Sequence, residues 1–405
     1  MGIRELVVGM SRVEKVAWLL FSATAVQLAF QWPGLILVPG ERTNLFSALL
    51  CLLSLIAAWL VAKKGTIRIK SPEFLISLVL AILAFFSGLF SLTPLSSSFR
   101  VAALLASGLG GFWCARLLLD TEAKLRLFRH LCLFILAGIL LLSFLGFLVW
   151  GRTTHFFDPT IHSYTHMIYL LSFAPLALLS QNSRSGFLLG LLLLGLSLLI
   201  FCLSRDIYSP LVTLSLVVWA AIFGRWRLKS FLIMFLLFIV VIGLFRHRIP
   251  WQLAARDQES VWYRVECLPF SWRIATEHPL FGIGLRTPRE KFLEDYQIKY
   301  PWVKKEKFAG ALSRMITCDN MFLTFLAGLG LPFLIIYSAA LLLLYLRLLF
   351  LTVKSPGKLP LPPLALLLPI TAGLLSFLVF DTLLFPQLCW YFHLLLGLIP
   401  PAPES

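Results

Sequence analysis

Charged residues are scarce in this sequence. Only 13% of its 405 residues are Asp, Glu, Lys or Arg, whereas 59% are hydrophobic and the mean hydropathy is +0.90. Soluble globular domains carry about 25% charged residues, so this composition excludes a soluble protein. Apolar stretches long enough to cross a bilayer recur from end to end, which predicts an all-α polytopic membrane protein. The short alternating segments typical of a membrane β-barrel are missing.

Cysteine is also sparse and forms no recognisable motif. The seven cysteines are scattered, without a CxxC pair, and no HExxH sequence occurs. We therefore expect no metal site and no cofactor. Cys267 and Cys318 both fall on the predicted outer side and could form a disulfide, although nothing in the sequence brings them together.

The apolar runs predict about twelve transmembrane helices, with a large helical loop on the outer side between spans 9 and 10. This division places spans 1–9 in residues 1–245, the loop domain in 246–318, and spans 10–12 with a short tail in 319–405. In the long tenth span, Pro332 removes a backbone hydrogen bond, so we expect a bend at 328–333. The predicted spans are 15–33, 44–62, 73–92, 99–117, 127–150, 163–181, 186–203, 207–223, 229–245, 319–351, 361–380 and 383–398.

Basic residues indicate the orientation. With a cytoplasmic N-terminus, 18 of the 35 Lys and Arg residues fall in inner segments, and only Arg42, Arg100, Arg152 and Arg205 fall in the short outer loops. This is a positive-inside pattern that puts both termini in the cytoplasm. The net charge of +16 is therefore explained by topology and by attraction to the lipid bilayer, without a nucleic-acid partner.

The remaining 13 basic residues lie in the outer loop, which is also rich in Trp and Tyr. Its aromatic content argues against disorder. The stretch SVWYRVECLPFSWRIATEHPL reads as an amphipathic helix that could lie at the bilayer surface. The aromatic side chains suit glycan stacking and interface anchoring equally well.

Two groups of polar residues stand beside apolar runs on the outer side. Ser204 and Arg205 occupy a short turn, where Arg205 either binds an anionic group or is neutralised by Asp206 at the interface. Arg264 and Arg273 are nine residues apart, which on one helix puts them on opposite faces. Both arginines and the nearby His278 could bind substrate or be solvated.

A third polar pair, Asp319 and Asn320, directly precedes the tenth apolar run. Asp319 could simply be the N-cap of that helix, where its carboxylate would also favour the positive end of the helix dipole. Alternatively, a carboxylate at the edge of the bilayer could be functional, because chains usually avoid placing one there.

Taken together, these motifs resemble the O-antigen ligase and O-antigen polymerase superfamily, whose members use glycans linked to polyprenyl diphosphates. The resemblance covers about residues 200–335 by motif and the whole chain by topology. Asp319 departs from the histidine usual in this family, Asp206 from a glycine, and Leu268 from a tryptophan. The matching positions are Ser204, Arg205, Arg264, Pro279, Gly282, Gly284, Asn320, Leu323, Gly328 and Gly330.

The resemblance implies an enzyme of the bacterial inner membrane with its active site in the periplasm. Such an enzyme would move a glycan from a polyprenyl diphosphate carrier to a hydroxyl on a glycolipid or glycan acceptor. Arg205 and Arg264 would stabilise the leaving diphosphate without a metal, and Asp319 would be the general base of an inverting transfer. Ser204, Arg273, His278 and Asn320 are the predicted substrate-binding residues.

Two alternatives stay open at this point. Within the same chemistry, the chain could be an O-antigen or exopolysaccharide polymerase, or could transfer to protein. In a different class, it could be a transporter or flippase of lipid-linked sugar, for which charges within the spans and paired broken helices are typical. Most predicted spans carry no charge, which favours an enzyme.

Overall fold

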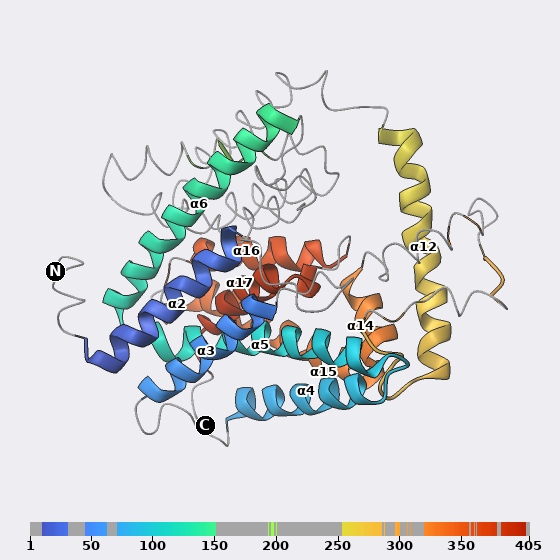
Figure 1. The fold of residues 1–405 in the computed structure, drawn as a ribbon, viewed down its shortest axis with the longest axis horizontal. Helices are drawn as coiled ribbons and strands as arrows, with labels where there is room; N and C mark the ends of the chain where they lie inside the picture. The colour runs from blue at the N-terminus through green and yellow to red at the C-terminus, as the bar shows by residue number, and fades with distance from the viewer. Residues whose placement is uncertain are drawn as a thin grey trace.

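A computed structural model describes the chain in part. The described residues are 10–30, 45–62, 71–150, 193, 196, 197, 200, 253–285, 287, 296–299, 306, 308, 320–355, 358, 359, 361, 363–378 and 382–401. Within these residues the regular structure is entirely helical (Figure 1). The predicted spans between 163 and 245 lie outside the described residues, apart from four single positions.

The first five predicted spans correspond to five helices. Ser71 begins the third of them, because its side chain accepts a hydrogen bond from Phe74 N and Pro72 occupies the first turn. Pro94 likewise stands in the first turn of the fourth helix. These helices are α2 (Arg12–Phe30), α3 (Leu45–Val61), α4 (Pro72–Leu89), α5 (Pro94–Leu118) and α6 (Glu122–Trp150).

Five described helices are long and apolar enough to cross a membrane, namely α2, α4, α5, α6 and α15 (Leu331–Lys354). Large apolar side chains on their outer faces, such as Phe85 and Leu343, are more than 60% exposed. An apolar surface of this kind suits a hydrocarbon environment. The described residues therefore agree with a polytopic membrane protein and do not confirm twelve spans.

The last two predicted spans are shorter than expected. They correspond to α16 (Pro363–Ser376) and α17 (Pro386–Gly397), with a short 3-10 helix, η3 (Thr382–Leu384), before α17. A membrane span needs about 20 residues, whereas α16 has 14 and α17 has 12. Most of α17 is buried against α5 at the centre of the bundle, so it belongs to the core.

Glycines allow α5 and α17 to approach each other closely. A side chain at Gly111 would overlap the carbonyl group of Trp390, and one at Gly397 would overlap that of Phe112. Small residues serve this purpose between membrane helices, where backbone contact replaces the hydrophobic driving force of water. The buried rings of Phe21, Phe128 and Trp390 fill the neighbouring core.

The predicted bend in the tenth span is confirmed as a complete break. Helix α14 (Met321–Leu329) ends at Gly330, which has φ +86° and ψ 170°, and α15 starts at Leu331 with Pro332 in its first turn. A residue with positive φ cannot continue an α-helix, so the apolar run becomes two helices. The second helix alone is long enough to be a span.

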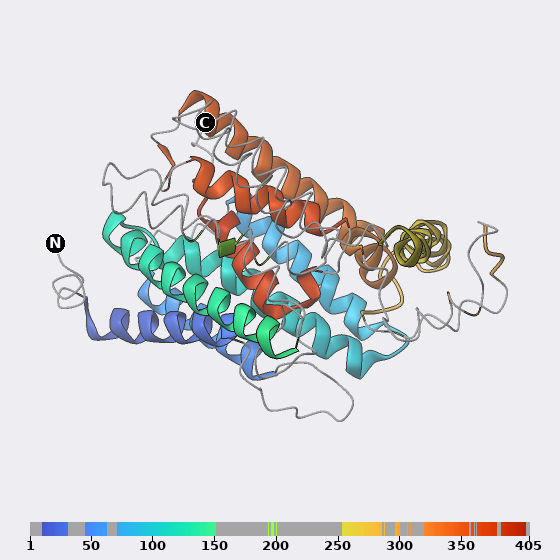
Figure 2. The same cartoon turned by 90° about the horizontal axis from the view of Figure 1, so that it is seen from above.

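A helix of the predicted outer loop, α12 (Leu253–Glu277), lies crosswise at one end of the bundle, beside α14 (Figures 1 and 2). A separate small core holds it there, built from Tyr263, Phe270, Ile274, Phe308 and Ala327 among others. Leu268 and Trp272 on α12 remain more than half exposed. The crosswise position agrees with a helix lying along the bilayer surface.

Candidate functional site

The two glycine-containing motifs of the sequence meet in space. The segment 279–285 leaves the end of α12 and lies along α14, so that Ile283 N donates to Ala327 O at 2.9 Å and Gly284 N to Gly328 O at 3.0 Å. Leu331 N, just after the helix break, donates to Pro279 O at 2.9 Å. Main-chain bonds therefore lock together two motifs that are about 45 positions apart in the sequence.

Two motif glycines are required by this backbone contact. Gly282 has φ +63°, and a Cβ there would lie 2.5 Å from Ala327 O. Gly330 has φ +86°, and a Cβ there would overlap the carbonyl group of Leu280. Because positive φ is costly for other residues, the glycines of the motif are explained by the fold rather than by contact with a substrate.

Hydroxyl groups from the last turn of α4 and the first turn of α5 complete this junction. The Ser87 hydroxyl lies 2.6 Å from Phe281 O and 2.9 Å from Gly328 O, so it bridges both motif segments. Leu285 N donates to Ser97 Oγ at 3.0 Å. The sequence analysis did not single out these serines, because a serine in an apolar helix usually bonds to its own helix backbone.

Asn320 is the N-cap of α14. Its side-chain oxygen accepts from Leu323 N at 3.1 Å, and its side-chain nitrogen donates to Leu378 O at 3.0 Å. Next to it, Met321 N donates to Phe377 O at 2.8 Å. The alternative in which Asp319 caps this helix is therefore wrong, because the neighbouring amide already does so. Asp319 itself lies outside the described residues.

Arg264 and Arg273 both belong to α12, which runs without interruption from Leu253 to Glu277. At 100° per residue, nine residues amount to two and a half turns, so positions 264 and 273 fall on opposite sides of the helix backbone. Arg273 pairs with Glu277 at 3.0 Å and lies 6.0 Å from the centre of the Tyr296 ring. These neighbours give Arg273 a structural role, and its predicted substrate contact stays a prediction.

His278 follows the last residue of α12 and begins the turn into the glycine segment. Its backbone N donates to Ile274 O at 2.8 Å, and its carbonyl oxygen accepts from Gly282 N at 3.1 Å. Ser204 and Arg205 lie outside the described residues. The structure therefore places Asn320 at the start of α14, whose other end forms the glycine junction. The meeting of Arg205, Arg264 and Asp319 stays a prediction.

A buried carboxylate ties the outer loop to α12. Glu266 is fully buried and accepts hydrogen bonds from Tyr296 Oη at 2.6 Å and from Lys299 N at 3.0 Å. Burial, and then the hydrogen bond to this carboxylate, raise the pKa of the Tyr296 phenol. Tyr296 therefore stays a donor at neutral pH and fixes segment 296–299 against the helix that carries Arg264.

His393 on α17 is a packing histidine, because both its ring nitrogens form hydrogen bonds within the bundle. Nδ1 lies 2.8 Å from Cys389 O, and Nε2 lies 3.1 Å from Tyr337 Oη. Cys267 is fully buried on α12, and Cys318 lies outside the described residues, so their pairing stays a prediction.

The bundle of apolar helices, with a crosswise helix and a glycine junction at one end, defines a polytopic membrane protein. Residues 167–338 match the model of the O-Antigen ligase family. This match confirms the resemblance to the O-antigen ligase and polymerase superfamily, whose members are glycosyltransferase-like membrane enzymes. It covers every motif position from Ser204 to Gly330. No curated protein matches the chain.

Proposed function

We propose that this protein transfers a glycan from a polyprenyl diphosphate carrier to a hydroxyl acceptor, at the periplasmic face of the bacterial inner membrane. The observation that carries this proposal is the glycine junction, which anchors the end of α14 beside the end of α12 through Ile283 N–Ala327 O and Leu331 N–Pro279 O. The three proposed catalytic residues all fall within the segment that matches the family.

Asp319 is the general base in this proposal. It directly precedes the cap of α14 in sequence, and the bonds of Asn320 to Leu323 and Leu378 fix the point at which that helix starts. A carboxylate at the N-terminal end of a helix is stabilised in its ionised form by the helix dipole. An ionised carboxylate can take the proton of the incoming sugar hydroxyl as the new glycosidic bond forms.

Arg205 and Arg264 stabilise the leaving diphosphate in this proposal. Negative charge grows on the carrier as its bond to the sugar breaks, and two guanidinium groups can hold diphosphate oxygens through charge-assisted hydrogen bonds. In a partly dry site this stabilisation can replace a metal ion. Attack from the face opposite the diphosphate would invert the configuration of the sugar.

Asn320 is a positioning residue in this proposal, because its amide already serves two backbone groups. Ser204, Arg273 and His278 would contribute to binding of the diphosphate or the glycan. The acceptor can be a lipid A-core glycolipid, which would make the protein a ligase, or a second lipid-linked glycan, which would make it a polymerase. The two activities require the same catalytic groups.

The test uses membrane vesicles that contain the full-length protein and a radiolabelled lipid-linked glycan. We expect Arg205→Ala, Arg264→Ala and Asp319→Asn each to lower transfer by about 100-fold or more, since each removes charge stabilisation or the base. Arg126→Ala, at an exposed position of α6, and Glu306→Gln, at an exposed helical position, are matched controls. Full transfer by all three variants, or directional lipid movement without a new glycosidic bond, would overturn the proposal.

A further inference from the structure

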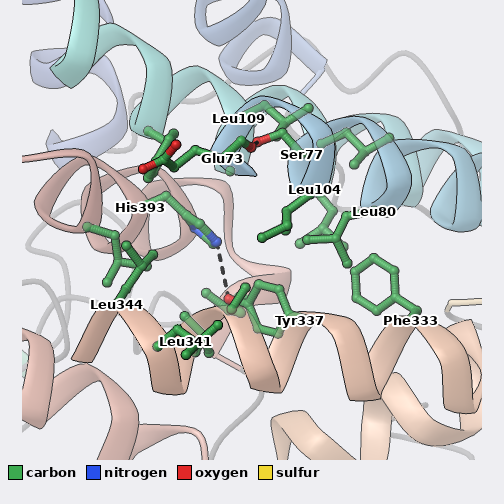
Figure 3. Close-up of a pocket in the computed structure, with 18 of the residues that line it drawn as sticks. Glu73, Ser77, Leu80, Leu104, Leu109, Phe333, Tyr337, Leu341, Leu344 and His393 are labelled. Carbon is green, nitrogen blue, oxygen red and sulfur yellow. Dashed lines mark hydrogen bonds between the residues drawn. The ribbon is translucent and has the colours of Figure 1, made fainter. Parts of the chain in front are cut away.

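A narrow cavity of about 250 Å³ runs between α4, α5, α15 and α17 (Figure 3). Figure 3 shows Glu73 and Leu344 toward one end, and Leu80 and Phe333 toward the other. From Arg347 to Phe333 the cavity follows 14 residues of α15, which is about 21 Å at the rise of an α-helix. The cavity is therefore long and thin, the shape of a single extended chain.

Apolar side chains form most of the cavity wall. The polar pair in the middle, Tyr337 and His393, is already satisfied, because the two side chains bond to each other and His393 Nδ1 also bonds to Cys389 O. A carbonyl oxygen only accepts, so Nδ1 carries the proton and Nε2 accepts from the Tyr337 hydroxyl. The middle of the cavity thus suits a hydrocarbon and not a polar ligand.

The cavity reaches the surface that faces lipid. Leu343 lines the cavity and is 62% exposed. On the other side of the cavity, Leu78 and Val79 on α4 are also exposed. A hydrocarbon chain could therefore enter sideways from the bilayer, between α4 and α15, without crossing a polar barrier.

Two arginines mark the end of the cavity that is farther from the glycine junction. Arg347 lines the cavity, and the guanidinium of Arg116 lies 5.4 Å from the ring centre of Phe112, another lining residue. Arg116 Nη2 and Arg347 Nε are buried and have no hydrogen-bond partner within the described part of the chain. Burying such donors is costly without an acceptor.

Among the described residues, the charges at this end are in positive excess. Asp120 and Lys358 line a hollow with Arg116, and Asp120 is already paired with Lys124 at 2.9 Å. Arg116 interacts electrostatically with both Glu73 and Arg347, so one remaining carboxylate, Glu73, faces two guanidinium groups. Arg347 also donates a hydrogen bond from Nη2 to Pro401 O. This carbonyl is neutral, so it does not balance the positive charge of the guanidinium group. An anion at this end would supply both the missing acceptor atoms and the balancing charge.

We propose that this cavity binds an anionic phospholipid, with one acyl chain between α4 and α15 and its phosphate against Arg116 and Arg347. The headgroup end is the side that the charge pattern predicts to be cytoplasmic. This site is distinct from the residues of the proposed catalytic site, since it lies at the end of the cavity opposite Phe325 of α14 and Phe333. The inference does not depend on the proposed function.

The test compares two photoactivatable lipids that carry the same diazirine-labelled acyl chain, one a phosphatidylglycerol and the other a phosphatidylcholine. The full-length protein is reconstituted in nanodiscs with each lipid and illuminated, and crosslinked peptides are mapped. We expect crosslinks in 72–89 and 331–354, several-fold more frequent with the phosphatidylglycerol. Equal labelling by the two lipids, or no labelling of these helices, would overturn the proposal.

Variants separate the two parts of the site. Arg116→Gln and Arg347→Gln should remove the advantage of the anionic lipid, whereas Lys354→Gln at an exposed position of α15 should keep it. Ala340→Phe, at a residue that lines the cavity, should lower labelling by both lipids several-fold. Leu342→Phe, at a residue that is 57% exposed, is its control.

A polyprenyl phosphate added as competitor identifies the other possible occupant. If it displaces the phosphatidylglycerol from 331–354 at a lower concentration than unlabelled phosphatidylglycerol does, the cavity holds a carrier chain and the proposal is wrong. The comparison on the unmodified protein stands even if an arginine variant fails to fold. Because no glycan transfer is measured, the result is independent of the catalytic proposal.

Discussion

The two ends of the bundle are held together differently. At the glycine junction, main-chain groups of segments distant in sequence bond directly to one another, as in Ile283 N–Ala327 O and Gly284 N–Gly328 O. At the other end, buried donors of Arg116 and Arg347 have no partner among the described residues. The first end is complete by itself, whereas the second has the chemistry of a site that a ligand completes.

This difference explains why the sequence motifs cluster at one end. A junction built from main-chain bonds depends on glycine at a few positions and on small hydroxyl side chains, and such requirements appear in the sequence as a motif. A cavity lined by Leu and Phe has no such requirement, because many apolar residues fill a wall equally well. Substitutions at the glycine junction should therefore cost more stability and more glycan transfer than substitutions in the cavity wall.

Gly330→Ala is expected to cause the largest loss of folding stability among these variants. Alanine would have to adopt φ +86°, a cost of about 1–3 kcal/mol from backbone strain alone. Its Cβ would also overlap the carbonyl of Leu280, which adds to that cost. Thermal unfolding of the purified protein should show a clear loss of stability, and glycan transfer should fall with it. Gly88→Ala, where a Cβ would lie 3.2 Å from Ser98 and φ is ordinary, should cost much less. Equal losses for the two variants would contradict this explanation of the motif glycine.

Ser87→Ala should come next. Its hydroxyl bridges Phe281 O and Gly328 O, and loss of a buried hydrogen bond costs about 1–3 kcal/mol. Ser77→Ala is a matched control on the same helix, because its hydroxyl bonds to Glu73 O of its own helix and, among the described residues, to no other segment. We expect a lower melting temperature and reduced transfer for the first variant only. A similar loss in both variants would mean that the Ser87 hydrogen bonds to Phe281 O and Gly328 O do not add to stability.

Asn320→Ala should cost about 1 kcal/mol, the usual value for loss of an N-cap. Asn320→Ser should recover most of this stability, because a serine hydroxyl can also cap the helix. The serine variant would still lack the hydrogen bond to Leu378 O. If Asn320 sets the position of Asp319, transfer by the serine variant should stay low while its melting temperature recovers. A purely structural role would make the two measurements recover together.

Tyr337→Phe should have the smallest effect on transfer. It removes the hydroxyl that bonds to His393, which should cost about 1 kcal/mol of stability. Because Tyr337 lines the cavity and lies away from the glycine junction, the rate of glycan transfer per folded protein should change little. A large loss of transfer at full stability would show that the two ends are coupled.

Part of the glycine junction could be foreseen from residue types and their order. The helix break at 328–333 follows from local backbone chemistry, because glycine permits positive φ and proline removes a hydrogen-bond donor. The predicted catalytic residues stay a prediction. The cap of α14 could not be foreseen. Asp319 and Asn320 are both good N-cap residues, and contacts with 377–378 place the helix start at Asn320.

The sequence by itself determined the class of protein and the positions of its first helices, because hydrophobic length is a property of one continuous segment. It also determined the order of the motifs by which the family is recognised. Tertiary structure alone decided that α17 is a core helix, that Ser87 bridges two motifs, and that Tyr296 bonds to the buried Glu266. Each of these depends on which distant segments pack together, and the apolar pattern of a single helix does not specify its neighbours.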